Sequence, residues 1–452
     1  MKLKTLTLIP IMLAVLYAAP DRFEFDGMRY VGDIEKTFDV GSKGELVMER
    51  IRGDVTIEGE ARNDVLIVER FKIDAYSETS AQSILSAEKA RFQQRGNRII
   101  VSTTDRSRRY SSNFSIKVPL NFNTIVQTSG GDVTISTVAG TQNLNTSGGD
   151  VEFTDCQGIM NGRTSGGDIR IRRAEGKLDI STSGGDINLD VFGGDLRANT
   201  SGGDIKLNKV KANGQATTSG GDIDINYLWA KTFTARTSGG DIGADKVEGD
   251  LNLHTSGGDI ILGQIVGNAE VHTSGGFIEA RQIDKNLKAT TSGGDIKVGL
   301  VKGYCYVRTS GGDIEVDRAY DLEAITSGGD ITASGIVGYI YARTSGGDIE
   351  ARKLFRPEVT NNAVDLETSG GDIKAYLPAN LNADIDAEIT ITDRWMADAN
   401  IRSEFPLARS QDIKGSRIYI YARGKINQGG VIIRLRSVNG DIDIIKTASN
   451  SK

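Results

Sequence analysis

The residues best placed for chemistry are aspartates that follow a recurring Thr-Ser-Gly-Gly tetrapeptide. This tetrapeptide occurs fourteen times, and twelve of its thirteen spacings are 17, 18 or 19 residues. In one copy Phe277 takes the place of the aspartate. The thirteen aspartates are Asp132, Asp150, Asp168, Asp186, Asp204, Asp222, Asp241, Asp259, Asp295, Asp313, Asp330, Asp348 and Asp372. Carboxylates repeated in this way could bind a row of Ca²⁺ ions or accept hydrogen bonds within turns.

Stacked carboxylates need something to relieve their repulsion. At ~4.8 Å, the spacing of paired strands, two neighbours repel by roughly 3 kcal/mol at an effective dielectric constant of about 20. Turn N–H groups and Ser or Thr hydroxyls can donate to them, whereas the fuller G-G-x-G-x-D spacing of calcium-binding repeats is absent. We therefore expect a structural column and no cofactor, with Ca²⁺ as the alternative. The aspartates considered as Ca²⁺ ligands are Asp168, Asp186, Asp204 and Asp222.

The only two histidines, His254 and His272, are a second candidate for metal binding. Each stands just before the threonine of a copy, so stacking would make them neighbours on an outer face. Paired imidazoles can bind Zn²⁺ or Cu²⁺, but the sequence offers no third ligand nearby. We therefore expect no metal site, and this pair is the candidate if a metal binds.

Tyrosine and arginine side chains recur on the outward positions of the last strand in several copies. Both residue types anchor binding surfaces and stack on sugars or peptides, although aromatic residues also simply favour strands. The partner-binding candidates are Tyr304, Tyr306, Tyr339, Tyr341, Arg308 and Arg343.

Catalysis has little support in the sequence. The chain contains no G-x-S-x-G elbow, no H-E-x-x-H helix and no phosphate-binding loop. Enzymes built on β-helices cluster two or three carboxylates or basic residues on one face, whereas here the carboxylates recur regularly. We therefore expect no catalytic and no cofactor-binding residues.

The repeat itself must position these side chains. Counted from the threonine, apolar residues occupy positions 6, 8, 11, 15 and 17 in most copies. Alternation at 6 and 8, and again at 15 and 17, is typical of strands, while glycine near position 13 and in Ser-Gly-Gly suits corners. The fixed period predicts an all-β, single-stack parallel β-solenoid with about 18 residues and two main strands per coil. The same parity turns the threonines inward, which argues against an ice-binding array.

The two cysteines, Cys156 and Cys305, occupy inward positions eight coils apart. At the ladder spacing they are ~38 Å from each other, and a disulfide needs Cα atoms within about 7 Å. We expect two free, buried thiols.

Irregular sequence at both ends predicts capping regions. Residues 19–127 combine strand patterns with one helix, expected over 79–95, and residues 381–452 hold degenerate coils that end in VNGDIDII. The regular repeats occupy residues 128–380. Caps would cover the open sheet edges of the stack.

The first residues resemble a secretory signal. Lys2 and Lys4 precede an apolar run from Leu6 to Leu16, and Ala18 offers a small residue for cleavage. Without residues 1–18, the 54 basic and 60 acidic residues become 52 and 60, a net charge of −8. These charges are dispersed, which excludes a nucleic-acid stripe, and no later segment is apolar enough to cross a membrane. The expected location is the periplasm, the cell surface or the extracellular space.

The sequence resembles the bacterial putative-adhesin family, a domain of unknown function that forms β-solenoids. The similar segments are TFDVGSKGELVMERIRGDVTIEG (37–59), RGNRIIVST (95–103), SIKVPLNFNTIVQTSGGDVTIS (115–136), the TSGGDI units and RSVNGDIDI (436–444). The resemblance implies an exported or surface repeat protein without a catalytic signature.

Together these features predict an exported, non-enzymatic, adhesin-like or envelope-surface scaffold. Its repeated faces would bind a surface glycan or protein through many weak contacts. A polysaccharide-active β-helix lyase or hydrolase and a purely architectural envelope rod are the alternatives.

Overall fold

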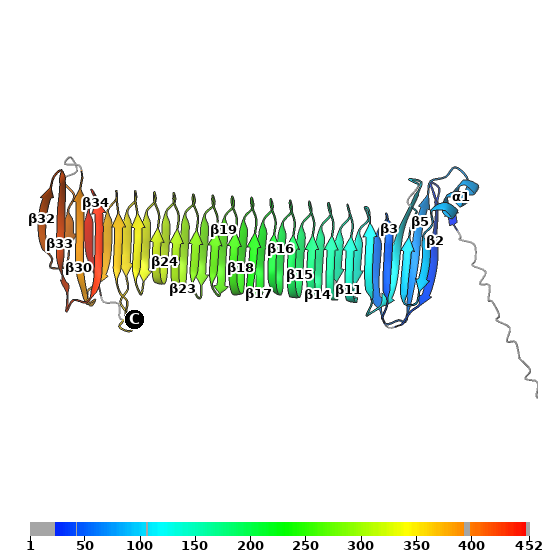
Figure 1. Ribbon diagram of the computed structural model, residues 1–452, viewed down its shortest axis with the longest axis horizontal. Coiled ribbons are helices and arrows are strands. Elements are labelled where there is room, and N and C mark those ends of the chain that lie inside the picture. The colour runs from blue at the N-terminus through cyan, green and yellow to red at the C-terminus, as the bar shows by residue number, and fades with distance from the viewer. Residues whose placement is uncertain (1–22, 42, 105–106, 393–397, 449–452) are drawn as a thin grey trace, which may run out of the picture.

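The protein forms one elongated parallel β-solenoid, shown along its length in Figure 1. The computed structural model describes residues 23–41, 43–104, 107–392 and 398–448. About 13 turns of about 18 residues stack between two wider caps. The predicted all-β, single-stack solenoid is therefore confirmed. The expected signal segment, residues 1–18, lies outside the described residues.

Each regular coil has a first wall at positions 6 to 9 and a second wall at positions 14 to 18. In seven coils one strand bends through the corner and forms both walls. These strands are β14 (Ile169–Ser181), β15 (Ile187–Asn199), β16 (Ile205–Thr217), β17 (Ile223–Arg236), β18 (Ile242–His254), β23 (Ile296–Arg308) and β24 (Ile314–Ile325). In other coils the walls are separate strands. These are β10 (Val133–Ser136), β11 (Ala139–Asn145), β12 (Val151–Thr154), β13 (Gln157–Arg163), β19 (Ile260–Val266), β20 (Ala269–His272), β21 (Ile278–Ile283), β22 (Leu287–Thr290), β25 (Ile331–Ile336), β26 (Ile340–Thr344), β27 (Ile349–Lys353), β28 (Val364–Thr368) and β29 (Ile373–Pro378).

Equivalent side chains lie directly above one another inside the stack. Ile169 pairs with Ile187, and Ile187 pairs with Ile205, in one parallel ladder. All three are fully buried, and one continuous apolar core runs through the rod. Burial of apolar surface against both neighbouring coils is what holds an 18-residue coil in place.

The threonine that opens each repeat points inward and fixes the turn, as its parity predicted. The hydroxyl of Thr182 donates to the carbonyl of Gly167 in the coil before it, at 2.8 Å. The same oxygen accepts the N–H of Gly185, at 3.3 Å. Because the hydroxyl both donates and accepts a hydrogen bond, burying it costs little free energy. Threonine therefore suits this inward site.

The backbone needs special conformations at the corner between the walls. Arg173, at position 10, has a φ of 49°, and Gly176, at position 13, has a φ of 132°. Glycine reaches such angles without steric cost, which explains its frequent use at position 13.

At the N-terminal cap the stacking order departs from the chain order. Its elements are β1 (Phe23–Phe25), β2 (Tyr30–Asp39), β3 (Glu45–Ile51), β4 (Val55–Glu60), β5 (Asp64–Ile73), α1 (Glu78–Glu88), β6 (Arg91–Arg95), β7 (Arg98–Ser102), β8 (Tyr110–Pro119) and β9 (Asn123–Thr128). The coil of β3 and β4 lies between the later β7–β8 and β9–β10 coils. Antiparallel strands β5, β2 and β1 then close the first wall.

In the C-terminal cap the stacking order also departs from the chain order, because a later coil lies between two earlier ones. Its strands are β30 (Ala383–Ile391), β31 (Ile401–Ser403), β32 (Ala408–Lys414), β33 (Arg417–Ile426), β34 (Val431–Val438) and β35 (Ile442–Thr447). The last coil along the chain, β34 and β35, lies between the β28–β29 coil and the earlier β30–β31 pair. Antiparallel strands β33 and β32 end the second wall.

The helix is shorter than the sequence pattern indicated. Ser77 caps α1, which ends at Glu88, so the prediction of a helix over 79–95 was wrong in its last turns. Arg91–Arg95 is strand β6, and the two residues Gly96 and Asn97 turn it into β7 as an antiparallel hairpin. Gly96, with a φ of 60°, is therefore a hairpin glycine and not a helix cap.

Both cysteines are free and buried in the core, as predicted. Burial raises the pKa of both thiols, so neither behaves as a reactive thiolate.

Candidate functional site

The aspartate column forms a hydrogen-bonded ladder along the rod. Oδ1 of each aspartate accepts the backbone N–H of the residue at position 5 in the next coil, at 2.7 to 3.1 Å. Asn113 supplies the first acceptor, to Asp54, and Asn400 donates the last N–H, to Asp441. The ladder therefore continues into both caps.

Local contacts lower the cost of stacking these charges. Arg170 binds Asp150 at 2.6 Å and Asp168 at 2.7 Å. Partial burial acts to raise the pKa of Asp150, but the Asp168 N–H and the Arg170 guanidinium outweigh it and hold this pKa below its usual value. Among the described residues, no group of three or more His, Cys, Asp or Glu side chains is arranged to hold a metal ion.

Phe277 interrupts the ladder at one rung. Its N–H still donates to Asp259, at 2.9 Å, but its side chain offers no acceptor to Asp295 in the next coil. The ring is 40% exposed.

The two histidines are neighbours, as their spacing predicted. His254 pairs with His272, and their rings stack with centroids 5.0 Å apart. Nδ1 of His272 lies 2.8 Å from the hydroxyl of Thr290. Partial burial, the His272 ring and Arg236 lower the pKa of His254, so the neutral form of His254 is favoured near neutral pH.

The tyrosine candidates converge on one carboxylate of the second wall. The Tyr304 hydroxyl donates to Oε2 of Glu323 at 2.6 Å, and the Tyr339 hydroxyl lies 3.4 Å from the same oxygen. Tyr306 and Tyr341 flank Glu323 in register on the strands to either side. We call these four tyrosines and Glu323 the tyrosine patch.

The contacts of Glu323 keep both hydroxyls protonated. Partial burial and the Glu323 carboxylate raise the pKa of Tyr304, and the same two causes raise the pKa of Tyr339 to about 12. The rings are thus held by hydrogen bonds that persist through the physiological pH range.

The arginine candidates lie beside the patch, one strand apart. Arg308 and Arg343 pair with opposite sides of Ile325 on β24. Arg343 also forms an ion pair with Glu367, at 3.4 Å. The structure therefore brings all six partner-binding candidates to one outer face, where they lie on β23, on β26 and, for Tyr339, just before β26, on either side of β24.

A groove of about 520 Å³ begins at the tyrosine patch and follows the rod axis. Its lining side chains come from successive coils of the second wall. They are Thr232, Asp250, Leu251, Asn252, Asn268, Ala269, Glu270, Asn286, Leu287, Lys288, Tyr304 and Tyr306. Only its tyrosine end was among the sequence candidates.

Short side chains at position 14 line the groove and form a second ladder. Oδ1 of Asp250 accepts the backbone and side-chain N–H groups of Asn268, at 2.8 and 3.1 Å. Oδ1 of Asn268 likewise accepts the backbone and side-chain N–H groups of Asn286, and Oδ1 of Asn286 accepts the backbone N–H of Tyr304. An Asp, Asn, Asn run at position 14 was the available sequence signal.

Two irregular coils bound this groove. An additional residue in the coil of β17 shifts the register between Trp229 and Thr232, at one end. A missing residue in the coil of β24 shifts the register between Val301 and Tyr304, at the other end.

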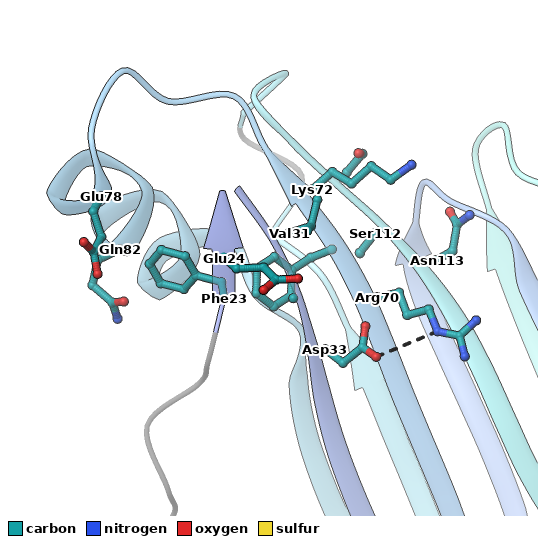
Figure 2. A pocket seen from close by; sticks show the side chains of 13 residues that line it. Phe23, Glu24, Val31, Asp33, Arg70, Lys72, Glu78, Gln82, Ser112 and Asn113 are labelled. Carbon is teal, nitrogen blue, oxygen red and sulfur yellow. Dashed lines mark ion pairs between the residues drawn. The ribbon is translucent and has the colours of Figure 1, made fainter. Parts of the chain in front are cut away.

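A larger hollow, of about 1240 Å³, lies at the N-terminal cap between α1 and the strands β1, β2, β5 and β8. Figure 2 shows Glu78 and Gln82 on its helix side, and Asp33 and Arg70 opposite them. Asp33 and Arg70 pair at 4.0 Å, as the dashed line marks. Sequence reasoning missed this hollow because no repeat forms it.

A buried lysine was also missed. Lys353 is 1% exposed, and its ammonium donates to the carbonyls of Val337 and Gly338 in the preceding coil. Burial lowers the pKa of Lys353 to about 7, against the opposing effect of Asp321.

These features define a β-solenoid repeat protein with ladder-stabilised corners and an elaborated outer face. The family model described as Toastrack DUF4097 matches residues 53–193 and 190–321, which is more than half of the chain. The chain belongs to this family, and the resemblance inferred from its sequence is confirmed. No curated protein matches the chain.

Several solved structures are similar over a large part of the chain. A putative adhesin from Bacteroides fragilis is 13% identical, covers 61% of this chain and 96% of its own, and has a TM-score of 0.25. A putative cell adhesion protein from Clostridium sporogenes is 9% identical, covers 92% and 100%, and has a TM-score of 0.14. A putative lipid binding protein from Parabacteroides distasonis is 11% identical, covers 63% and 93%, and has a TM-score of 0.20. The family assignment rests on the sequence match.

Proposed function

We propose that the protein is an exported, non-enzymatic, adhesin-like scaffold that binds a surface partner through the outer face of its second wall. The observation that carries this proposal is the convergence of Tyr304 and Tyr339 on Glu323. Two hydroxyls from coils that are not adjacent hold their rings in place at the surface. Pre-ordered aromatic rings lose little conformational entropy when a partner binds.

The rod geometry supports multivalent contact. Ladder pairing holds equivalent outward side chains ~4.8 Å apart along the axis, so a long partner can meet several coils at once. Many weak contacts on one rigid body add to a high overall avidity. No helix among the residues that the structure describes has both the length and the apolarity to span a membrane.

The test is binding of the purified mature chain to cell-envelope preparations and to arrays of glycans and surface proteins. The double variant Tyr306→Ala, Tyr341→Ala should lose most of the binding, because both rings leave the patch. The matched control is Tyr376→Ala, which removes a tyrosine from the first wall. Equal binding by all three proteins would contradict the proposal.

The enzymatic alternative needs its own assay. The protein should release no sugar from bacterial polysaccharides in lyase and hydrolase assays. Turnover that a single carboxylate substitution abolishes would overturn the non-enzymatic assignment.

A further inference from the structure

The groove beside the tyrosine patch has the features of a ligand site. Its walls are side chains of five successive strands, from Thr232 on β17 to Tyr306 on β23. Four strand-to-strand steps of ~4.8 Å give it a length of roughly 19 Å along the rod. An occupant must therefore be an extended chain that runs parallel to the rod axis.

The backbone beneath the groove is closed to a peptide strand. β20 pairs with β18 on one side and with β22 on the other, and β22 pairs with β23. Their N–H and C=O groups are used within the sheet, and peptide addition to a sheet requires an open edge. An extended peptide would therefore gain no strand pairing on this face.

The charges along the groove are largely satisfied within it. Lys288 pairs with Glu270 at 2.7 Å, and Oδ1 of Asp250 accepts two N–H groups from Asn268. A polyanion would meet a net negative lining of two carboxylates and one ammonium. An uncharged chain avoids this repulsion and does not need to break the ion pair.

The remaining groups suit a carbohydrate. The Tyr304 and Tyr306 rings end the groove, and Tyr304 is 37% exposed. Aromatic rings offer an apolar face to the C–H groups of a sugar, with a polar hydroxyl at the rim. Asn252, Glu270 and Lys288 alternate donors and acceptors along the side.

We infer that this groove binds an extended, uncharged glycan, with the sugar at one end stacked on Tyr304 and Tyr306. This inference rests on the proposed binding function and names the ligand class for that face. The ligand lies along positions 14 and 16 of the second wall, over the ladder of Asp250, Asn268 and Asn286.

A groove-filling substitution tests the inference without removing any hydrogen bond described here. Asn252→Tyr places a ring in the groove, and Gln215→Tyr places the same ring at the equivalent position two coils away, outside it. Binding of cellohexaose and hexa-N-acetylchitohexaose, both uncharged, is measured by calorimetry, with polygalacturonate and chitosan as anionic and cationic comparators.

We expect uncharged oligosaccharides to bind the parent protein and Gln215→Tyr equally, and Asn252→Tyr to bind them at least tenfold more weakly. Unchanged affinity in Asn252→Tyr, or stronger binding of either charged polymer by the parent protein, would overturn the inference. If Asn252→Tyr binds the uncharged oligosaccharides as the parent protein does, while Tyr306→Ala, Tyr341→Ala loses envelope binding, the proposed function stands and the glycan groove falls. If Asn252→Tyr keeps its oligosaccharide affinity and Tyr306→Ala, Tyr341→Ala keeps its envelope binding, both the glycan groove and the proposed function are overturned.

Discussion

The backbone N–H of Asp168 donates a 2.8 Å hydrogen bond to Oδ1 of Asp150, one coil below. The same relationship recurs through most of the rod and reaches asparagines at both ends. Each aspartate except Asp295, which follows Phe277, is thus both a donor through its backbone and an acceptor through its side chain. The aspartate is therefore conserved between repeats for a local reason: it ties one Ser-Gly-Gly turn to the next.

Removing one acceptor should weaken the stack, and keeping the acceptor without its charge should not. Asp186 accepts the N–H of Asp204 at 2.8 Å. Asp186→Ala leaves that N–H without a protein partner and should destabilise the fold by about 1 kcal/mol, the usual net value of one hydrogen bond. Asp186→Asn keeps the amide oxygen and removes the repulsion from Asp168 and Asp204. It should match or exceed the parent protein in urea denaturation, and equal losses for both variants would contradict the ladder account.

Calcium should not be required for stability. The ladder uses one carboxylate oxygen of each rung internally, and the described residues show no three-ligand cluster. We expect the same melting temperature in millimolar Ca²⁺ and in chelator. A rise of several degrees with Ca²⁺, but not with Mg²⁺, would favour the cation alternative.

The second glycine of each Thr-Ser-Gly-Gly copy should be far less replaceable than the first. A Cβ on Gly203 would lie 2.0 Å from the carbonyl oxygen of Gly185, whereas one on Gly202 would lie 3.6 Å from its nearest neighbour, the Gly184 oxygen. Gly203→Ala should cost about 3 kcal/mol or more, at the upper end of overpacking. Gly202→Ala, as the matched control, should stay within about 1 kcal/mol of the parent protein. Similar denaturation midpoints for the two variants would show that coils separate easily.

The regular part of this fold could be predicted because one period repeats every local requirement. Apolar positions, corner glycines and inward threonines all recur in the same order, so each copy supports the same interpretation. Stacking then follows, because a single coil cannot bury its apolar side chains alone. The free cysteines and the paired histidines followed from the same numbering.

The caps could not be predicted in this way, since their stacking order differs from their chain order. The β3–β4 coil resembles a repeat, but nothing in the sequence placed β8 outside it. The helix ends earlier than the sequence pattern predicted because residues 91–95 pair with β7 as a strand. The pair Gly96 and Asn97 between two strand-like runs was the overlooked hairpin signal.

The candidate site was only partly predictable for a related reason. Their positions in the repeat, 14 and 16, predicted that Tyr304, Tyr306, Tyr339 and Tyr341 share one face. The sharing of Glu323 depends on the missing residue in the β24 coil, which shifts the register at Tyr304. The groove depends on short position-14 side chains between two irregular coils. Such differences between copies carry functional information that the shared pattern does not.

His254 should make stability depend on pH just below neutrality. Its pKa is lowered in the folded protein, so the unfolded chain takes up a proton first as pH falls. Stability should therefore be complete above the ordinary histidine value of about 6.5 and should decline below it. His254→Gln should flatten the curve between pH 7.5 and 5.5 relative to the parent protein. An unchanged slope in that variant would show that the histidine pair does not contribute.

Lys353 should make stability depend on pH above neutrality. Its folded-state pKa is about 7 and its ordinary value is 10.5, so the unfolded chain holds the extra proton between these limits. Stability should therefore rise with pH from about 7 toward 10.5, because a falling proton concentration disfavours the unfolded chain, which binds the extra proton. Lys353→Met removes the titrating group and should lose this rise, although the carbonyls of Val337 and Gly338 then lack their donor. Urea midpoints at pH 7, 8 and 9 test this, with Lys374→Met on the exposed first wall as the control. A parallel pH dependence in Lys353→Met and the parent protein would mean that Lys353 stays charged in its site, held by those two carbonyls.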